Sequence, residues 1–232
     1  MRSRQNTLEA QANNIANAST AGFKAERLIY DSVEARKKGA GDKQNLVVGV
    51  STTGTVDFSA GSIQQTGRSL DVAIDGDAFL QVQTARGTRF TRAGNLTLNA
   101  GGQLVTKNGD IVVGENGTIT VPNDGELSIG RDGSLAAGAQ IFDKLKLVRF
   151  DNPAAALSKE GDSLFLATGA EQPRENVNSG IVQGALENSN INSISEMVAM
   201  INNNREFESL QKSVSLLMND IGRKISGEIA KM

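Results

Sequence analysis

Three aspartates stand close together in the middle of the sequence, at Asp71, Asp75 and Asp77. Carboxylates at such spacing could hold a divalent cation such as calcium, or could act as a general acid and base. The surrounding pattern favours a structural role. Asp71 and Asp75 alternate with apolar residues, as on the solvent side of a strand, and Asp75-Gly76-Asp77 has the composition of a turn. We therefore predict neither a catalytic site nor a metal site.

The residue types on which many enzymes and metal sites depend are missing from the sequence. The 232 residues include no His and no Cys, which excludes zinc fingers, Cys–His and Ser–His nucleophiles, His-ligated haem, iron–sulfur clusters and disulfides. A formal net charge of −2 argues against a broad nucleic-acid surface. No apolar run reaches the roughly 18 residues of a membrane span. We predict no enzyme, no cofactor, no nucleic-acid binding and no membrane insertion.

The first secondary-structure element predicted from the sequence is a short N-terminal helix. Met1, Leu8, Ala12 and Ile15 follow helical spacing and form one apolar stripe. Gly22 can take a positive φ after the last turn. The basic N-terminus has no apolar stretch after it, so we expect no cleaved signal peptide.

A second and much longer helix is predicted from Asn192 almost to the end of the chain. Ser193 and Glu196 form a capping-box pattern, and no proline follows them. A helix over 193–231 would measure about 58 Å at about 1.5 Å per residue. Its apolar stripe contains Met200, Phe207, Leu210, Val214, Leu217 and Ile221, with Asn203 at the one polar position.

A stripe of this length requires a surface to cover it. One interpretation folds the long helix onto the chain's own β domain. We prefer a coiled coil, because the stripe is narrow and flanked by charged residues. Since the other helical stripe lies at the opposite terminus, we expect Leu8, Ala12 and Ile15 to pair with the C-terminal stripe, and both to meet neighbouring copies of the chain.

The middle of the chain has the alternating pattern of short strands. Asn-Gly and Asp-Gly pairs favour turns between adjacent antiparallel strands and recur every eight residues, which predicts a meander of hairpins over 108–135. These pairs are Asn108-Gly109, Asn116-Gly117, Asp124-Gly125 and Asp132-Gly133. Predicted strands are 70–74, 79–83, 89–92, 96–98, 103–106, 111–113 and 144–150.

The predicted fold class is α+β, with discontinuous N- and C-terminal helices forming a coiled-coil-like domain and a central, mostly antiparallel β domain. The helical domain comprises 1–35 plus 185–232, and the β domain comprises 69–184. Residues 36–68 form an irregular or β connection, whose polar part from Arg36 to Asp42 we expect to be a loop.

Three motifs in this layout resemble the axial proteins of the bacterial flagellum, the rod and hook family. They are residues 13–24, residues 70–82 with 90–96, and residues 186–192 with 196–198. The family-signature positions within them are Asn13, Asn14, Asn17, Gly22, Phe23, Asp71, Gly76, Phe79, Asn188, Ser189, Asn190 and Glu196.

The resemblance implies structural work. Family members are exported unfolded by the flagellar type III apparatus without a cleaved signal. They assemble in the periplasm into the rod of the basal body, an axial tube that transmits torque from motor to hook. The implied partners are copies of the chain, other rod proteins above and below, and the export apparatus. Family members carry further, partly apolar residues before the position of Met1, so we expect that a segment is missing here.

A phage-tail or adhesin-type β module is the alternative structural interpretation, because such proteins also combine hairpins with terminal helices. In that case the helical region should form a discrete parallel trimer.

Overall fold

The computed structural model describes residues 2–38, 44–122, 127–175 and 179–229. The chain forms two compact units. Unit 1 comprises Met1–Ala16, Arg27–Gly54 and Asn192–Met232, and unit 2 comprises Asn17–Glu26 and Thr55–Ile191. The fold is α+β, as predicted, with a mostly antiparallel β domain and a long C-terminal helix.

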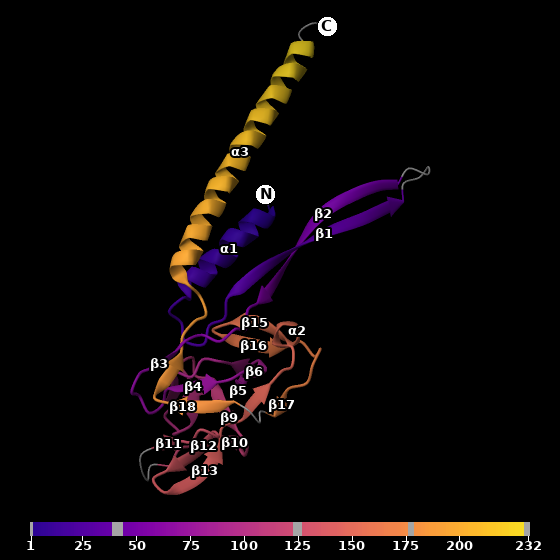
Figure 1. Ribbon diagram of the computed structural model, residues 1–232. Coiled ribbons are helices and arrows are strands. Elements are labelled where there is room, and N and C mark those ends of the chain that lie inside the picture. The colour runs from indigo at the N-terminus through magenta and orange to yellow at the C-terminus, as the bar shows by residue number, and fades with distance from the viewer. Residues whose placement is uncertain (1, 39–43, 123–126, 176–178, 230–232) are drawn as a thin grey trace. The chain divides into compact units, whose positions relative to one another are not determined.

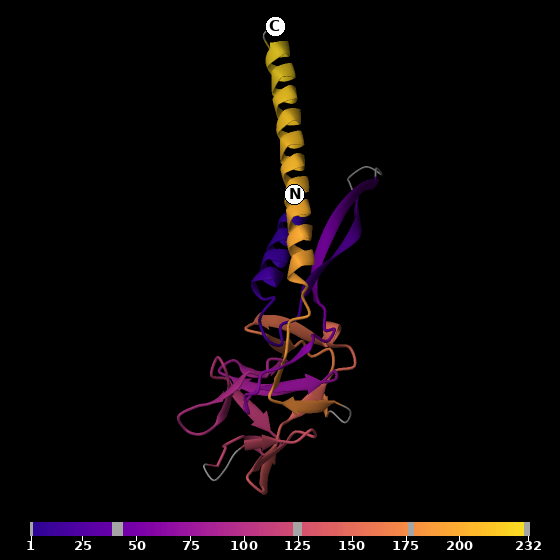
Figure 2. The same cartoon turned by 60° about the vertical axis from the view of Figure 1, so that its left-hand side comes forward.

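Two helices of very different length lie side by side in unit 1 (Figures 1 and 2). They are α1 (Arg2–Ala16) and α3 (Ser193–Ile229). They run antiparallel: Arg4 lies 2.9 Å from the carboxylate of Glu206 and donates to Asn203 at 3.2 Å, while Asn203 donates to Gln11 at 3.0 Å. At about 1.5 Å per residue, α1 is about 22 Å long and α3 about 56 Å, so α1 can accompany less than half of α3.

The start of α3 is where the sequence predicts it, but its cap is a different residue. The side chain of Asn192 accepts from the backbone N–H of Ser195 at 3.1 Å, and its carbonyl accepts from Glu196 at 3.0 Å. The expected cap at Ser193 is therefore wrong. Asparagine caps at least as well as serine and stands one residue earlier, so Ser193 becomes the first helical residue.

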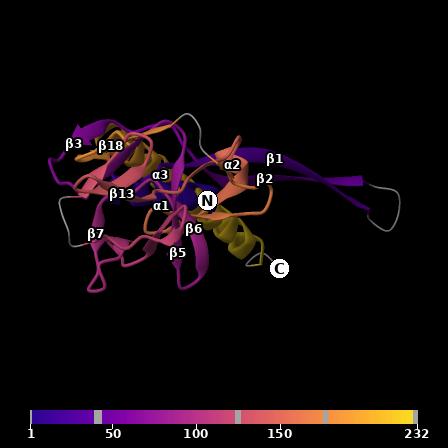
Figure 3. The ribbon, with the colours of Figure 1, turned by 90° about the horizontal axis from the view of Figure 1, so that it is seen from below.

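A long two-stranded ribbon also belongs largely to unit 1. It pairs β1 (Glu26–Lys38) with β2 (Gln44–Val56), and Figure 3 shows the two strands running along each other. The loop predicted from Arg36 is wrong for residues 36–38, which continue β1, and its remainder falls mainly on 39–43, outside the described residues. A run of charged residues can continue a strand, because backbone N–H and C=O groups make the pairing between strands.

Unit 2 is built around a ten-stranded sheet. Its main order is β15-β16-β6-β5-β9-β8-β7; β10 pairs with β9, and β14 joins β5 to β17. The bounds are β5 Phe79–Thr84, β6 Gly87–Thr91, β7 Leu96–Leu98, β8 Leu104–Thr106, β9 Ile111–Gly114, β10 Gly117–Thr118, β14 Leu147–Arg149, β15 Leu157–Gly161, β16 Leu164–Ala167 and β17 Arg174–Glu175.

Three smaller sheets and one helical turn complete unit 2. A three-stranded sheet has the order β11-β12-β13, and two pairs join β18 to β4 and β19 to β3. The described strand pairs of this unit are antiparallel. The bounds are β3 Ile63–Gln65, β4 Val72–Asp75, β11 Leu127–Ile129, β12 Ser134–Ala137, β13 Gln140–Lys144, α2 Pro153–Ala156, β18 Gly180–Gln183 and β19 Ala185–Glu187.

The recurring Asn-Gly and Asp-Gly pairs mark turns next to strands of the structure, but these strands do not form a single meander. Asn108-Gly109 lies between β8 and β9, and Asp132-Gly133 between β11 and β12. Asn116 lies between β9 and β10, and Gly117 is the first residue of β10. Asp124-Gly125 lies outside the described residues. The strands fall into two sheets, so the single meander is wrong. The expected strand over 144–150 is likewise divided, because β13 ends at Lys144 and β14 begins at Leu147.

The core of unit 2 is mostly aliphatic, with one aromatic group beside it. Leu80, Val82 and Leu104 are among the fully buried residues of the aliphatic cluster. The rings of Phe58, Phe79, Phe90, Phe150 and Phe165 meet with centroids 5.1–6.1 Å apart, mostly edge to face. Such pairs add to the gain from burial alone. Unit 2 therefore buries most of its large apolar side chains within its own fold, with Ile63, Leu98, Ile141 and Leu166 as described exceptions.

Candidate functional site

The three aspartates of the central motif do not gather into a site. Asp71 is buried and accepts from Thr66 Oγ1 at 2.7 Å, Asp75 is exposed and lies 3.5 Å from Arg131, and Asp77 accepts from Ser179 at 3.2 Å. Among the described residues no three acidic side chains come together as metal ligands would. The solvent-facing interpretation holds for Asp75 but is wrong for Asp71, whose side chain is 1% exposed and accepts from Thr66, the residue after β3.

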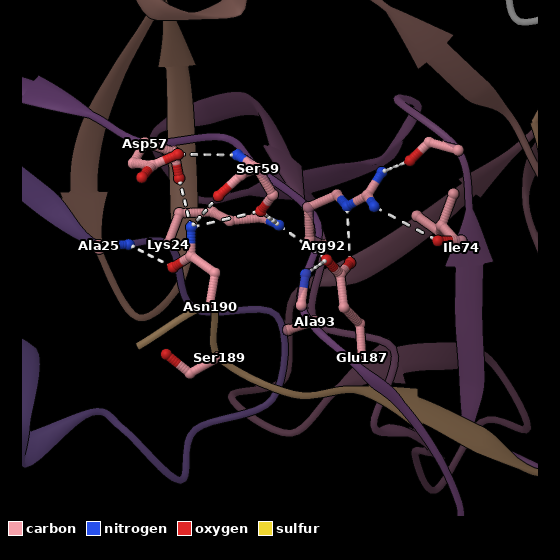
Figure 4. A network of polar contacts seen from close by, with 12 residues as sticks. Lys24, Ala25, Asp57, Ser59, Ile74, Arg92, Ala93, Glu187, Ser189 and Asn190 are labelled. Atoms are coloured by element: carbon pink, nitrogen blue, oxygen red, sulfur yellow. Dashed lines mark hydrogen bonds and ion pairs between the residues drawn. The ribbon is translucent and has the colours of Figure 1, made fainter. Parts of the chain in front are cut away.

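A buried ionic cluster is the most concentrated group of charges in unit 2 (Figure 4). Glu187 receives Lys24 Nζ on Oε1 at 2.7 Å and Arg92 Nε on Oε2 at 2.8 Å. The exposed fraction of the Lys24 and Glu187 side chains is 1%, and that of Arg92 is 3%. Asn190, beside them, completes what we call the ionic cluster: Lys24, Arg92, Glu187 and Asn190.

Backbone groups satisfy the remaining polar atoms of the ionic cluster. Arg92 donates to the carbonyls of Ile74, Gly76 and Ala78, which lie on β4 and the turn that follows it. Lys24 also donates to the carbonyl of Ser59 at 2.6 Å. These bonds fix both cations, because charge-assisted hydrogen bonds are strong inside a protein.

The electrostatics of the ionic cluster follow from burial and from its uneven charge. Burial lowers the pKa of Lys24, and Glu187 only partly offsets this. Burial alone would raise the pKa of Glu187, but the charges and hydrogen bonds of Arg92 and Lys24 outweigh it and hold that pKa below its usual value. Glu187 is therefore the ionised centre between two cations.

The segment that carries Lys24 passes very close to the rest of unit 2. Gly22 has the predicted positive φ, +66°, but it lies in the turn Thr20–Phe23 and not at the end of α1, which ends at Ala16. A Cβ at Gly22 would lie 2.3 Å from the backbone N of Ala93. The ring of Phe23 is covered by Lys159, whose Nζ lies 3.6 Å from the ring centroid and donates to the carbonyl of Lys24 at 3.2 Å. Burial also lowers the pKa of Lys159.

The three motifs singled out in the sequence meet at the ionic cluster. Lys24 comes from the first motif, Arg92 from the second, and Glu187 and Asn190 from the third. Nine of the family-signature positions lie in unit 2. The buried ones are Gly22, Phe23, Asp71, Phe79 and Ser189; the half-buried ones are Asn17, Asn188 and Asn190; and Gly76, with φ of +127°, lies in the turn between β4 and β5. The other three lie in unit 1, where Asn14 is buried, Glu196 is half-buried and Asn13 is exposed.

The helix-packing residues predicted in unit 1 have graded exposure. Leu8, Ile15, Met200 and Phe207 are half-buried, whereas Ala12 is exposed. Farther along α3 the same stripe stands in solvent: Leu210, Val214, Leu217 and Ile221 are 45–63% exposed. The stripe is therefore covered where the α1 contacts lie and bare beyond them.

The first turns of α3 expose a second group of large apolar residues, which was not predicted from the sequence. Ile194, Met197, Val198 and Ile201 are 49–74% exposed. With about 3.6 residues per turn, they are centred about 120° around the helix from Met200 and Phe207, on a different face. Their spacing, i, i+3, i+4 and i+7, was the signal that could have identified them.

Comparison with protein families gives matches to three stretches of the chain. Residues 1–24 match the family described as "Flagella basal body rod protein", residues 73–137 match "Flagellar hook protein FlgE/F/G D1 domain", and residues 182–216 match "Flagellar basal body rod FlgEFG protein C-terminal". Among the described helices, none combines the length and apolar character needed to cross a membrane.

Similar proteins extend over nearly the whole chain. The flagellar basal-body rod protein FlgF of Caulobacter vibrioides is 37% identical over 90% of this chain and 88% of its own length. The flagellar basal-body rod protein FlgG of Bacillus subtilis is 34% identical over 93% of this chain and 90% of its own. The FlgF protein of Mesorhizobium japonicum is 32% identical over 87% and 83%. The chain belongs to the flagellar basal-body rod and hook (FlgE/F/G) family.

Proposed function

We propose that this protein is a structural subunit of the flagellar basal-body rod and that it performs no catalysis. The observation that carries the proposal is α3, which exposes ten large apolar residues on two faces in a chain of the rod family. Burying a large aliphatic side chain contributes about 1.5–3 kcal/mol. The single chain leaves most of this gain unused, and copies of the chain can supply the missing surface.

The contacts between copies are proposed to involve the helical stripe. Leu210, Val214, Leu217 and Ile221 continue the face on which α1 lies against α3, so a helix from a neighbouring copy can extend that packing as a coiled coil. The two apolar faces of α3 are different and point in different directions. Head-to-tail contacts between unlike surfaces generate a filament when the rotation from copy to copy does not close into a ring, and we propose that this is the case here.

The place of the subunit follows from the same family. We infer that it lies in the axial tube of the periplasmic rod, between other rod proteins, with α1 and α3 (from the predicted domain 1–35 plus 185–232) toward the inner tube and the β domain (69–184) outside. Export by the flagellar type III apparatus without a cleaved signal belongs to the same proposal. An unfolded passage suits a chain whose helices acquire their partners only on assembly.

Within the family we favour a proximal rod protein of the FlgF type, with the distal rod protein FlgG as the alternative. The segment Arg205–Glu208 is the main support, because FlgG proteins usually have Ala and Tyr at the positions of Glu206 and Phe207. The relatives named FlgF and FlgG have similar identities to this chain, 37% and 34%.

A charge in the exposed stripe tests the proposal. Leu217→Asp should abolish swimming in cells that depend on this protein, because an unpaired carboxylate in a packed seam costs several kcal/mol. Ser215→Asp is the matched control, since Ser215 is exposed on the same turn and outside the stripe, and it should swim. Normal swimming by the Leu217→Asp strain would contradict the proposal.

The state of the purified protein provides a second test. In dilute solution the segments at both ends should exchange amide hydrogens quickly while 69–184 stays protected. Cross-linking at high concentration should give a ladder of oligomers. Trapping of discrete trimers alone would favour the phage-tail or adhesin interpretation.

A further inference from the structure

The chain passes between its two units at four points, after Ala16, Glu26, Gly54 and Ile191. Three segments of unit 2 adjoin these points: residues 22–25 precede the second, residues 57–61 follow the third, and residues 187–190 precede the fourth. We call them the linker segments. They lead by covalent connection to β1, from β2 and to α3.

Glu187 contacts both of the other linker segments. Its Oε1 accepts from Lys24 Nζ at 2.7 Å and from the backbone N–H of Gly61 at 2.9 Å. Its backbone carbonyl accepts from the N–H of Gly22 at 2.8 Å. One residue thus joins all three linker segments, although 163 positions separate it from Lys24.

Asn190 repeats the same connection with a neutral side chain. Its Oδ1 accepts from the backbone N–H of Ala25 at 2.9 Å, and its Nδ2 donates to the carbonyl of Asp57 at 2.8 Å and to Ser59 Oγ at 3.0 Å. A short backbone bond, Asp57 N–H to the carbonyl of Ala25 at 2.8 Å, lies directly beside it. The linker segments are therefore held together by side chains aimed at backbone groups.

Arg92 fixes this assembly to the β domain. It reaches Glu187 with Nε, and its other nitrogens donate to the carbonyls of Ile74, Gly76 and Ala78. The linker segments contribute one carboxylate and one cation, and the β domain contributes the second cation. Glu187 is consequently the charged group through which the linker segments are joined to Arg92.

Stability alone does not explain why charges occupy this position. A buried ion pair is often no more stabilising than apolar residues of the same size, whereas its directional bonds can specify one arrangement. None of the four residues of the ionic cluster belongs to either apolar cluster of unit 2, although Phe58 of the linker segment 57–61 packs against Phe79 and Phe165. The ionic cluster is therefore distinct from the apolar cores, which it adjoins at Phe58.

We propose that the ionic cluster is a clamp that sets the points at which the chain leaves and enters unit 2 on its way to β1, β2 and α3. Loss of the clamp frees the linker segments while the apolar cores of unit 2 stay closed. The proposal rests on the geometry of unit 2 and does not depend on the rod function.

Hydrogen exchange followed by mass spectrometry on the purified full-length chain tests the clamp. Glu187→Gln keeps the size of the side chain and removes its charge. We expect amide exchange in the linker segments to become about tenfold faster or more, with exchange in β5, β6 and β9 changing less than about twofold. Equal acceleration in the linker segments and in these core strands would overturn the proposal, and so would unchanged linker segments.

Glu160→Gln is the matched control, because Glu160 is also a carboxylate of unit 2 between two cations, Arg86 at 2.7 Å and Arg89. It touches no linker segment among its described contacts, so exchange there should not change. If Glu187→Gln does not fold, Lys24→Met replaces it, since this variant leaves the Arg92–Glu187 pair intact. Lys24→Met should accelerate exchange in residues 22–25 and 57–61, and unchanged exchange in both would overturn the clamp.

Discussion

Leu80 and Leu217 are the same residue type in opposite situations. Leu80 in β5 is completely buried among the strands of unit 2, whereas Leu217 in α3 is 63% exposed. The difference extends to their surroundings, since Val82 and Leu104 are buried with Leu80 while Val214 and Ile221 are exposed with Leu217. Unit 2 thus completes its core within one chain, and α3 does not.

This contrast separates two uses of apolar residues. In unit 2 they determine the free energy of unfolding of the single chain, because their burial is part of folding. In α3 they contribute only after another surface covers them, so they act on association. The same substitution, such as leucine to alanine, should therefore change the free energy of unfolding in unit 2 and the association of chains in α3.

The largest effect should come from truncating the two leucines in turn. Leu80→Ala removes buried methyl groups and leaves a cavity, so we expect the free energy of unfolding to fall by about 2–5 kcal/mol. Leu217→Ala should change it by less than about 0.5 kcal/mol. Urea denaturation of dilute protein measures both. A loss of similar size for Leu217→Ala would show that α3 is already covered in the single chain.

The next effect concerns the backbone of unit 2 and needs only one added methyl group. Gly22→Ala places a Cβ 2.3 Å from the backbone N of Ala93, at a φ of +66° that disfavours L side chains. We expect a loss of about 2–4 kcal/mol in urea denaturation, combining overpacking with backbone strain. Gly109→Ala is the control. Gly109 also has a positive φ, +91°, but a Cβ added there would have no atom within 4 Å apart from those of its chain neighbours. Gly109→Ala should therefore be clearly less destabilising, and equal losses would contradict the close-approach argument.

The elements of unit 1 and unit 2 were not equally predictable from sequence. The span of α3 and most strands of the large sheet follow from local periodicity, which the sequence displays directly. The ionic cluster does not, because Lys24 and Glu187 are 163 positions apart and Arg92 and Glu187 are 95 apart. No local pattern pairs them, although each lies inside one of the three motifs.

Two predictions from the sequence were wrong because a local pattern did not reveal the structural surroundings of the residues. The charged run at Arg36 predicted a loop, yet residues 36–38 continue β1, since the pairing of two strands is made by backbone groups and does not require apolar side chains. Asp71 looked like the solvent side of a strand because it alternates with apolar residues. It is buried, and Thr66, the residue after β3, donates to its carboxylate, a contact that local alternation cannot reveal.

Acid should weaken unit 2 partly through Glu187, with a smaller effect than the substitutions above. Its pKa is lower in the folded state, so its contribution is fully present above the unfolded value of about 4.3 and is lost as pH falls through the folded pKa. The free energy of unfolding, measured in urea from pH 7 to pH 3, should therefore fall less steeply for Glu187→Gln than for the unchanged protein. Parallel curves would contradict this assignment.

The smallest expected effect is a gain of stability in the turn between β15 and β16. Asp162 and Ser163 both have positive φ, 51° and 57°, which is uncommon for residues other than glycine. Two consecutive residues of this kind match the hairpin turn that favours Asn-Gly. The hydroxyl of Ser163 is buried without a hydrogen-bond partner among the described atoms, so its removal breaks no bond there.

Ser163→Gly should therefore raise the free energy of unfolding of unit 2 by about 0.5–1 kcal/mol, because relief of the left-handed backbone outweighs the greater freedom of glycine in the unfolded chain. Thr91 donates to the backbone carbonyl of residue 163 at 2.8 Å, and this bond survives the change. Ser158→Gly, in the middle of β15, is the control and should be destabilising, since a strand interior disfavours glycine. If Ser163→Gly lowered the urea midpoint as Ser158→Gly does, the positive φ of Ser163 would not destabilise the protein, and this prediction would be wrong.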